Sequence, residues 1–343
     1  MLPDLRKFKV SSSQIKSLMK EFGLGGVLNY SVEKGITHHH SNRIVVVKSD
    51  KDNEYVFKFY LKKERPLRFY IQFLVANKLI KRNFGTCRMY LTNEGKPFFK
   101  LKDYFVAAYD KIDGFPISYV GLDQLNKKKL VEFFTKLRRE LMMIEGKISF
   151  MRYIGSDLYR KYDLSNLMKS IYPKSIKDME LNSMLRKISI CLSPEKNKNR
   201  IRFVHGGVTS HNILCRNGDY YLIDFDHLGY DYCLQEFGGF IANLYMEKKN
   251  KDLINNLISE YVNANKLDTT SLRLLFSIVS FELIREYLKL SDRLNNLIKN
   301  KKLPDYLSIE SAKFDKEELT FRERHYLAYL RDTINFLCNK LSN

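Results

Sequence analysis

One stretch, FVHGGVTSHNILCRNGDYYLIDFD at positions 203–226, constrains the fold more than any other part of the chain. At its centre is Asn217-Gly218, a dipeptide that favours a type I′ turn because both of its residues tolerate positive φ. Strand-forming residues flank this turn, with ILC before it and YYLI after it. The pattern therefore predicts a β-hairpin with a two-residue loop.

The hairpin register brings polar side chains together at its open end. Counting outward from the turn places Asn212 opposite Ile223, so Asn212 and Asp224 are expected on neighbouring strands roughly 5 Å apart. Asp226 follows just beyond them. Amide and carboxylate oxygens are hard ligands of the kind that Mg²⁺ prefers. The hairpin is thus predicted to organise a metal site.

The same residues resemble a known family. HGGVTSHNIL followed by LIDFD is similar to the H-G-D-x-x-x-x-N and (I/L)-D-(F/W)-(D/E) motifs of the aminoglycoside phosphotransferase and choline kinase-like superfamily. The resemblance implies binding of ATP and Mg²⁺ and transfer of phosphate to a small-molecule hydroxyl. It also implies that Asn212 and Asp224 hold the metal, with Asp226 just beyond them as a further candidate ligand, and that His205 is the structural histidine of the catalytic loop.

The resemblance further implies an α+β, protein-kinase-like fold with two lobes. A small antiparallel β-rich N-lobe is expected over residues 1–112, and a larger helical C-lobe over residues 113–343. The length of 343 residues fits two domains.

One position departs from the family pattern. The catalytic aspartate, which would accept the proton of the substrate hydroxyl, falls at a position that carries Gly207 here. Three interpretations stay open. The chain is a non-catalytic pseudokinase or structural protein, or a slow phosphotransferase in which His211 or Asp226 partly substitutes, or an otherwise active enzyme changed at this one position.

Lys58 is the candidate phosphate-binding lysine. It lies in the alternating stretch EYVFKFYL, where a lysine faces either solvent or a cleft; given the downstream hairpin, we favour the cleft. By resemblance Lys58 pairs with the nucleotide phosphates and with a glutamate on the next helix. The best-spaced position of that helix carries Gln72 instead, and Glu64 lies too early.

The remaining nucleotide contacts are expected from the segment joining the lobes. Tyr109, Asp110, Lys111 and Ile112 resemble the hinge whose backbone groups bind the adenine edge. The loop at 35–42 stands where a phosphate-covering loop would be, and its three adjacent histidines are interpreted as exposed rather than as metal ligands.

Hydrophobic periodicity predicts the regular elements. A helix capped by Ser12 or Ser13 is expected before the first strand and is expected to stop at Gly23. The expected strands are 27–34, 43–48, 54–61 and two within 98–112, and the expected helices are 13–22, 67–82, 125–144, 236–248, 251–263, 269–299 and 317–341.

Composition bounds the location and partners. Five scattered cysteines without a CxxC pair suggest reduced thiols, and no signal peptide or membrane span is expected, which favours a cytoplasmic protein. The net charge of +20 indicates either a solvated basic surface or a face that binds polyanions weakly.

The general character of the chain resembles the spore-coat kinase-like branch, which would imply a spore-coat location and coat-protein partners. The acceptor molecule cannot be identified from these motifs.

Overall fold

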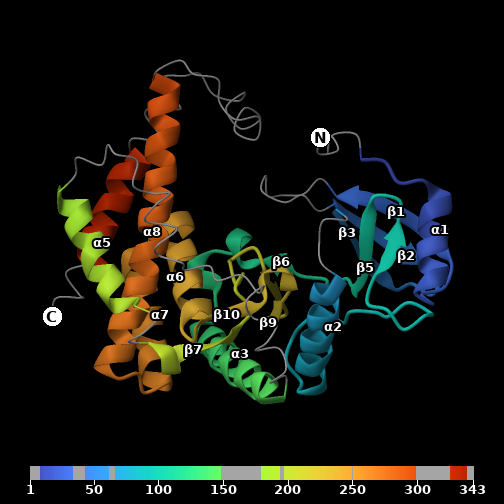
Figure 1. The fold of residues 1–343 in the computed structure, drawn as a ribbon, viewed down its shortest axis with the longest axis horizontal. Coiled ribbons are helices and arrows are strands. Elements are labelled where there is room, and N and C mark those ends of the chain that lie inside the picture. The colour runs from blue at the N-terminus through green and yellow to red at the C-terminus, as the bar shows by residue number, and fades with distance from the viewer. Residues whose placement is uncertain are drawn as a thin grey trace. The chain divides into compact units, whose positions relative to one another are not determined.

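The computed structural model describes residues 8–33, 43–61, 66–147, 179–193, 197–248, 250–298 and 325–337. They form two compact units (Figure 1). The first unit contains the described residues up to Gly114 together with Leu214–Asp226, and the second contains the remainder. The hairpin, assigned to the C-lobe in the predicted division at residue 112, thus clusters largely with the first unit.

The first unit is built on a five-stranded antiparallel sheet in the order β1-β2-β3-β5-β4. The predicted strands are confirmed to within a residue at their ends. The bounds are β1 Val27–Glu33, β2 Arg43–Ser49, β3 Glu54–Leu61, β4 Phe99–Leu101 and β5 Tyr104–Asp110.

Helix α1 (Ser12–Glu21) covers one face of this sheet. Ser11, rather than Ser12 or Ser13, is its N-cap, because Ser11 has extended backbone angles and forms a capping box with Gln14. The helix ends just before Gly23, whose φ is +65°.

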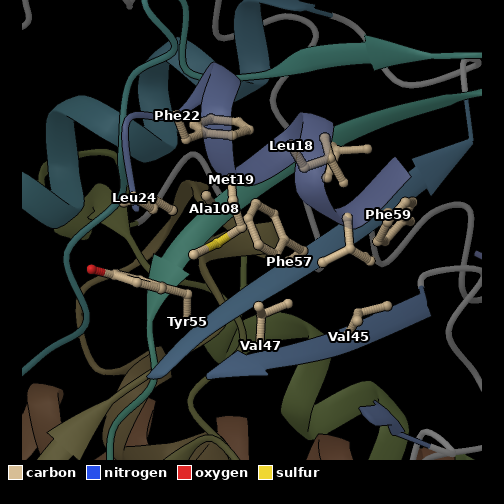
Figure 2. Close-up of a cluster of buried hydrophobic side chains, with 12 residues drawn as sticks. Leu18, Met19, Phe22, Leu24, Val45, Val47, Tyr55, Phe57, Phe59 and Ala108 are labelled. Atoms are coloured by element: carbon tan, nitrogen blue, oxygen red, sulfur yellow. The ribbon is translucent and has the colours of Figure 1, made fainter. Parts of the chain in front are cut away.

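The core beneath α1 follows from two matching periodicities. One face of the helix buries Ile15, Leu18, Met19 and Phe22, spaced three and four residues apart. Alternate strand residues pack against them, including Val45, Val47, Tyr55, Phe57 and Phe59 (Figure 2). Because side chains alternate along β3, Lys58 and Tyr60 project to the opposite face.

That opposite face carries α2 (Pro66–Lys81) and the hairpin. The rings of Tyr60 and Phe69 meet edge to face, with centroids 4.9 Å apart. The hairpin strands are β8 (Ile213–Arg216) and β9 (Asp219–Leu222), and the turn residues Asn217 and Gly218 both have positive φ, as predicted. Leu222 at the end of β9 donates its N–H to the carbonyl of Gly85, at 2.9 Å.

The second unit is mainly helical. Its helices are α3 (Lys127–Lys147), α5 (Met179–Cys191), α6 (Gln235–Lys248), α7 (Lys251–Ala264), α8 (Thr269–Ile298) and residues 325–337. The predicted helices that fall on described residues are confirmed. β6 (Phe115–Pro116) also belongs to this unit, as do β7 (Ile201–Val204) and β10 (Gly229–Tyr232), which form an antiparallel pair that sequence patterning did not predict.

Aromatic packing holds the helices of the second unit together. Phe134 of α3 contacts Phe237 and Phe240 of α6, with centroids 5.3 and 4.9 Å apart. Phe237 also stacks on Tyr261 of α7 at 3.7 Å. Along α3 one face is buried, and it consists of Leu130, Phe133, Phe134, Leu137 and Leu141. No helix among the described residues is long and apolar enough to span a bilayer.

Candidate functional site

Lys58 is buried within the first unit, which contradicts the solvent-facing interpretation of its strand position. Its Nζ lies 2.7 Å from Oδ1 of Asp224 and 2.6 Å from Oδ2 of Asp226. Burial alone would lower the pKa of the ammonium, but the two carboxylates outweigh it and hold the pKa well above its usual range. Lys58 therefore stays charged, and it lies beside both predicted acidic residues.

Asp224 has an uncommon backbone conformation. Its φ is +67°, in the left-handed region that residues other than glycine seldom adopt. The conformation is fixed locally, since Oδ1 of Asp224 accepts the N–H of Asp226 at 3.3 Å and the ammonium of Lys58. Strained residues of this kind concentrate at functional sites. The side chain of Asp224 keeps 18% of its surface exposed, twice the fraction of Asp226.

Asp226 is engaged on both carboxylate oxygens. Oδ1 accepts hydrogen bonds from the hydroxyl of Tyr60 at 2.8 Å and from Nε2 of Gln72 at 3.2 Å, while Oδ2 meets Lys58. The hydroxyl of Tyr109 in turn donates to Oε1 of Gln72 at 3.1 Å. Sequence patterning missed Tyr60, because its role depends on a residue of the distant hairpin.

The last three predicted hinge residues, Asp110, Lys111 and Ile112, differ in their backbone hydrogen bonds. The N–H groups of Asp110 and Lys111 donate to the carbonyls of Arg88 and Glu54, at 2.9 and 3.0 Å. In this conformation they are not available to an adenine edge. Ile112, by contrast, makes no backbone hydrogen bond to another described residue.

The loop that resembles the catalytic loop lies in the second unit. The buried carboxylate of Glu236 accepts the backbone N–H groups of His205 and Gly206 through Oε1. Asn212 donates from Nδ2 to the carbonyl of Gly207 at 2.8 Å. The loop is thus held from both ends, and Glu236 acquires a positioning role that the sequence motif did not specify.

His227 fills the space beside Gly207. A Cβ placed on Gly207 would lie 3.0 Å from Cδ2 of His227 and 3.4 Å from its Cβ. Gly206 differs, because it has a φ of +73° and a Cβ there would lie 2.2 Å from the backbone oxygen of His227. Position 207 accepts a side chain if one imidazole ring moves slightly, whereas position 206 requires glycine.

His211, one of the two candidate substitute bases, lies among polar groups of the same unit. Its Nδ1 is 2.9 Å from the hydroxyl of Ser118, and its Nε2 is 3.4 Å from Oε1 of Glu247. The imidazole side chain is 38% exposed. Asp226, the other candidate, has both oxygens engaged by Lys58, Tyr60 and Gln72.

Some of the sequence-based expectations stay predictions. Asn212 and Asp224 belong to different units, so their convergence on one metal ion is not established by the fold. The loop at 35–42 and Glu64 lie outside the described residues. Among the residues that are described, no group of three or more His, Cys, Asp and Glu side chains is arranged to hold a metal by itself.

Comparisons with solved structures identify the fold. A spectinomycin phosphotransferase in complex with ADP and spectinomycin matches 92% of this chain and 99% of its own, with a TM-score of 0.61 and 16% identity. An amicoumacin kinase in complex with AMP-PNP, Ca²⁺ and Ami matches 91% and 96%, with a TM-score of 0.56 and 13% identity.

An aminoglycoside phosphotransferase from Alicyclobacillus acidocaldarius matches 97% of this chain and 99% of its own, with a TM-score of 0.54 and 15% identity. No protein-family model and no curated protein sequence matches the chain. The chain therefore has the protein-kinase-like fold of the small-molecule phosphotransferases, as predicted.

Proposed function

We propose that this chain is an ATP- and Mg²⁺-binding protein of the small-molecule phosphotransferase type. The observation that carries the proposal is the partly buried contact of Lys58 with Asp224, which combines a permanent cation with a carboxylate in an uncommon backbone conformation. Solved structures with the same fold contain ADP or AMP-PNP, and one contains Ca²⁺.

The residues present are suited to a hard divalent cation. Mg²⁺ is usually bound through one or two carboxylates and the phosphates of a substrate, not by a complete protein cage. Asp224 would supply the carboxylate and Asn212 an amide oxygen, while Asp226 serves Lys58. When bound, the ion would neutralise charge on the β- and γ-phosphates. Lys58 would lie along the phosphates, and Ile112 would offer backbone groups to the adenine.

Because Gly207 lacks a side chain that could act as a general base, it is expected to limit the rate of phosphoryl transfer. Phosphoryl transfer relies chiefly on positioning and charge neutralisation, so a site without its base retains part of its rate. We propose a slow transferase in which His211, and not Asp226, serves as the substitute base, because both oxygens of Asp226 are already engaged. The acceptor is an alcohol of unassigned structure.

The second candidate function is a non-catalytic pseudokinase, either a scaffold or a spore-coat assembly protein. It is favoured by the single observation that Gly207 has no side chain to act as a base. This candidate shares the nucleotide site but predicts no turnover with any acceptor.

A thermal-shift screen tests the proposal. The chain would be melted with ATP, GTP or ADP, each with and without Mg²⁺ or Mn²⁺. A ligand present at 100 times its Kd adds about 2.7 kcal/mol of stability. A metal-dependent rise with ATP is expected, and no shift with any nucleotide would contradict the proposed function while leaving the fold unaffected.

A further inference from the structure

The helix that faces Lys58 presents an amide instead of a carboxylate. Gln72 of α2 is almost completely buried, with 1% of its surface exposed. Within the described part of the chain, the polar contacts of Lys58 go to Asp224 and Asp226, and its ammonium also lies 5.4 Å from the centre of the Tyr60 ring. Gln72 meets Asp226 and not the lysine.

The hydrogen-bond chemistry fixes the orientation of this amide. An ionised carboxylate only accepts, so the group of Gln72 that faces Asp226 must be its NH₂. The other end of the amide then accepts the hydroxyl proton of Tyr109. Tyr60 contributes its single hydroxyl proton to the same oxygen of Asp226.

We propose that Asp226 is the counter-ion that positions Lys58, and that Gln72, with Tyr60 and Tyr109, positions Asp226. This inference rests on the proposed function for its catalytic meaning. Lys58 on β3 and Asp226 after the hairpin thus form a lysine–carboxylate ion pair. This pair replaces the one expected between Lys58 and a glutamate on the next helix. Gln72 is a positioning residue that acts through Asp226, and its lack of charge is required.

The arrangement explains why a carboxylate in place of Gln72 would be unfavourable. A glutamate side chain there would still accept from Tyr109, but it would have no proton to donate to Asp226. Two carboxylates would then meet at about the present 3.2 Å in a buried site, where like charges disfavour each other strongly. If Gln72 were instead a weakened version of a lysine-binding glutamate, a glutamate at this position would be favourable.

The test compares Gln72→Glu with Gln72→Met, which has a similar shape but neither hydrogen bond nor charge. Melting temperatures would be measured without nucleotide, and Mg-ATP affinity would be measured well below the melting range. We expect both variants to melt below the parent chain, with Gln72→Glu lowest. Gln72→Glu should also weaken Mg-ATP binding at least about tenfold, the equivalent of one charged hydrogen bond.

A charge exchange provides the decisive control. Asp226→Asn combined with Gln72→Glu restores one carboxylate and one amide to the contact, so the double variant should melt above Gln72→Glu alone. A Gln72→Glu chain that is as stable as the parent, or that binds Mg-ATP more tightly, would overturn the inference. If the parent chain itself binds no nucleotide, the proposed function fails, and the order of melting temperatures still decides the inference.

Discussion

Nζ of Lys58 lies 2.6 Å from Oδ2 of Asp226, joining the middle of the N-terminal sheet to the end of a hairpin far along the sequence. The pair is largely withdrawn from water, with side-chain exposures of 11% and 9%. Charges in such a setting are tolerated because each one compensates the other. The first unit therefore depends on this contact for stability as well as for any chemistry.

Replacing Lys58 with Met is expected to destabilise the protein substantially. Removing one partner of a buried pair leaves uncompensated carboxylates and costs about 3–5 kcal/mol. Urea unfolding would measure the loss. Lys96→Met is the matched control, since Lys96 pairs with Glu94 at the surface, where water and salt screen the pair and its loss should change stability little. Equal losses for the two variants would show that Lys58 is not a buried counter-ion.

Gly207→Asp is expected to fold and to raise turnover. No positive φ is needed at this position, and the new Cβ requires only a small movement of the His227 ring. A general base contributes about 10²–10⁴-fold, so ATP turnover with an accepted alcohol should rise at least about tenfold.

Two control variants qualify the Gly207→Asp result. Gly206→Ala should destabilise the fold strongly, because its Cβ would collide with the His227 carbonyl. Adding His227→Ala should relieve any crowding around an aspartate at position 207.

Brisk turnover in the parent chain, lost on His211→Asn, would show that His211 already serves as base. A stable Gly207→Asp chain that binds Mg-ATP but transfers to no alcohol would favour the scaffold interpretation.

Cys87 is expected to resist thiol reagents in the folded protein. Burial raises the pKa of its thiol to about 12, so almost no thiolate exists near neutral pH. Cys191, Cys215 and Cys233 are partly exposed and should react first. Iodoacetamide labelling at pH 8, mapped by mass spectrometry with and without urea, measures the labelling rate of each cysteine in the folded and the unfolded protein. Labelling of Cys87 at the rate of Cys215 in the native state would contradict the burial assigned to it.

The basic charge allows a salt-dependent prediction. If the net charge of +20 forms a functional face, the chain should bind heparin at about 50 mM salt and release it by about 200 mM, as counterion release requires. Equal retention at both concentrations, or none at either, would indicate that the basic residues form only a solvated surface.

The sequence predicts those features whose causes are local. The Asn217-Gly218 turn, the alternating strand around Lys58 and the apolar stripe of α1 each depend on neighbouring residues, and each is found in the structure. The predicted N-cap lies one or two residues late, because three serines adjoin and only Ser11 combines extended backbone angles with a capping box to Gln14.

The network around Asp226 is not predictable in the same way. It depends on which face of α2 packs against the sheet and on where the hairpin meets β3, and both are set by tertiary packing. Sequence spacing suggests Gln72 as a partner of Lys58, but its amide meets Asp226 instead. Likewise, spacing does not reveal that Asp110 and Lys111 donate their N–H groups within their own unit.

Calorimetric titration of Mg-ATP into the parent chain and Asp224→Asn tests the central claim most directly. Asp50→Asn, an exposed acidic residue of the same unit, is the control for a change in net charge. We expect metal-dependent binding to the parent and to Asp50→Asn, weakened at least about tenfold in Asp224→Asn, as loss of a charged contact implies. Absence of binding to the parent chain, or equal affinity in all three proteins, would contradict it.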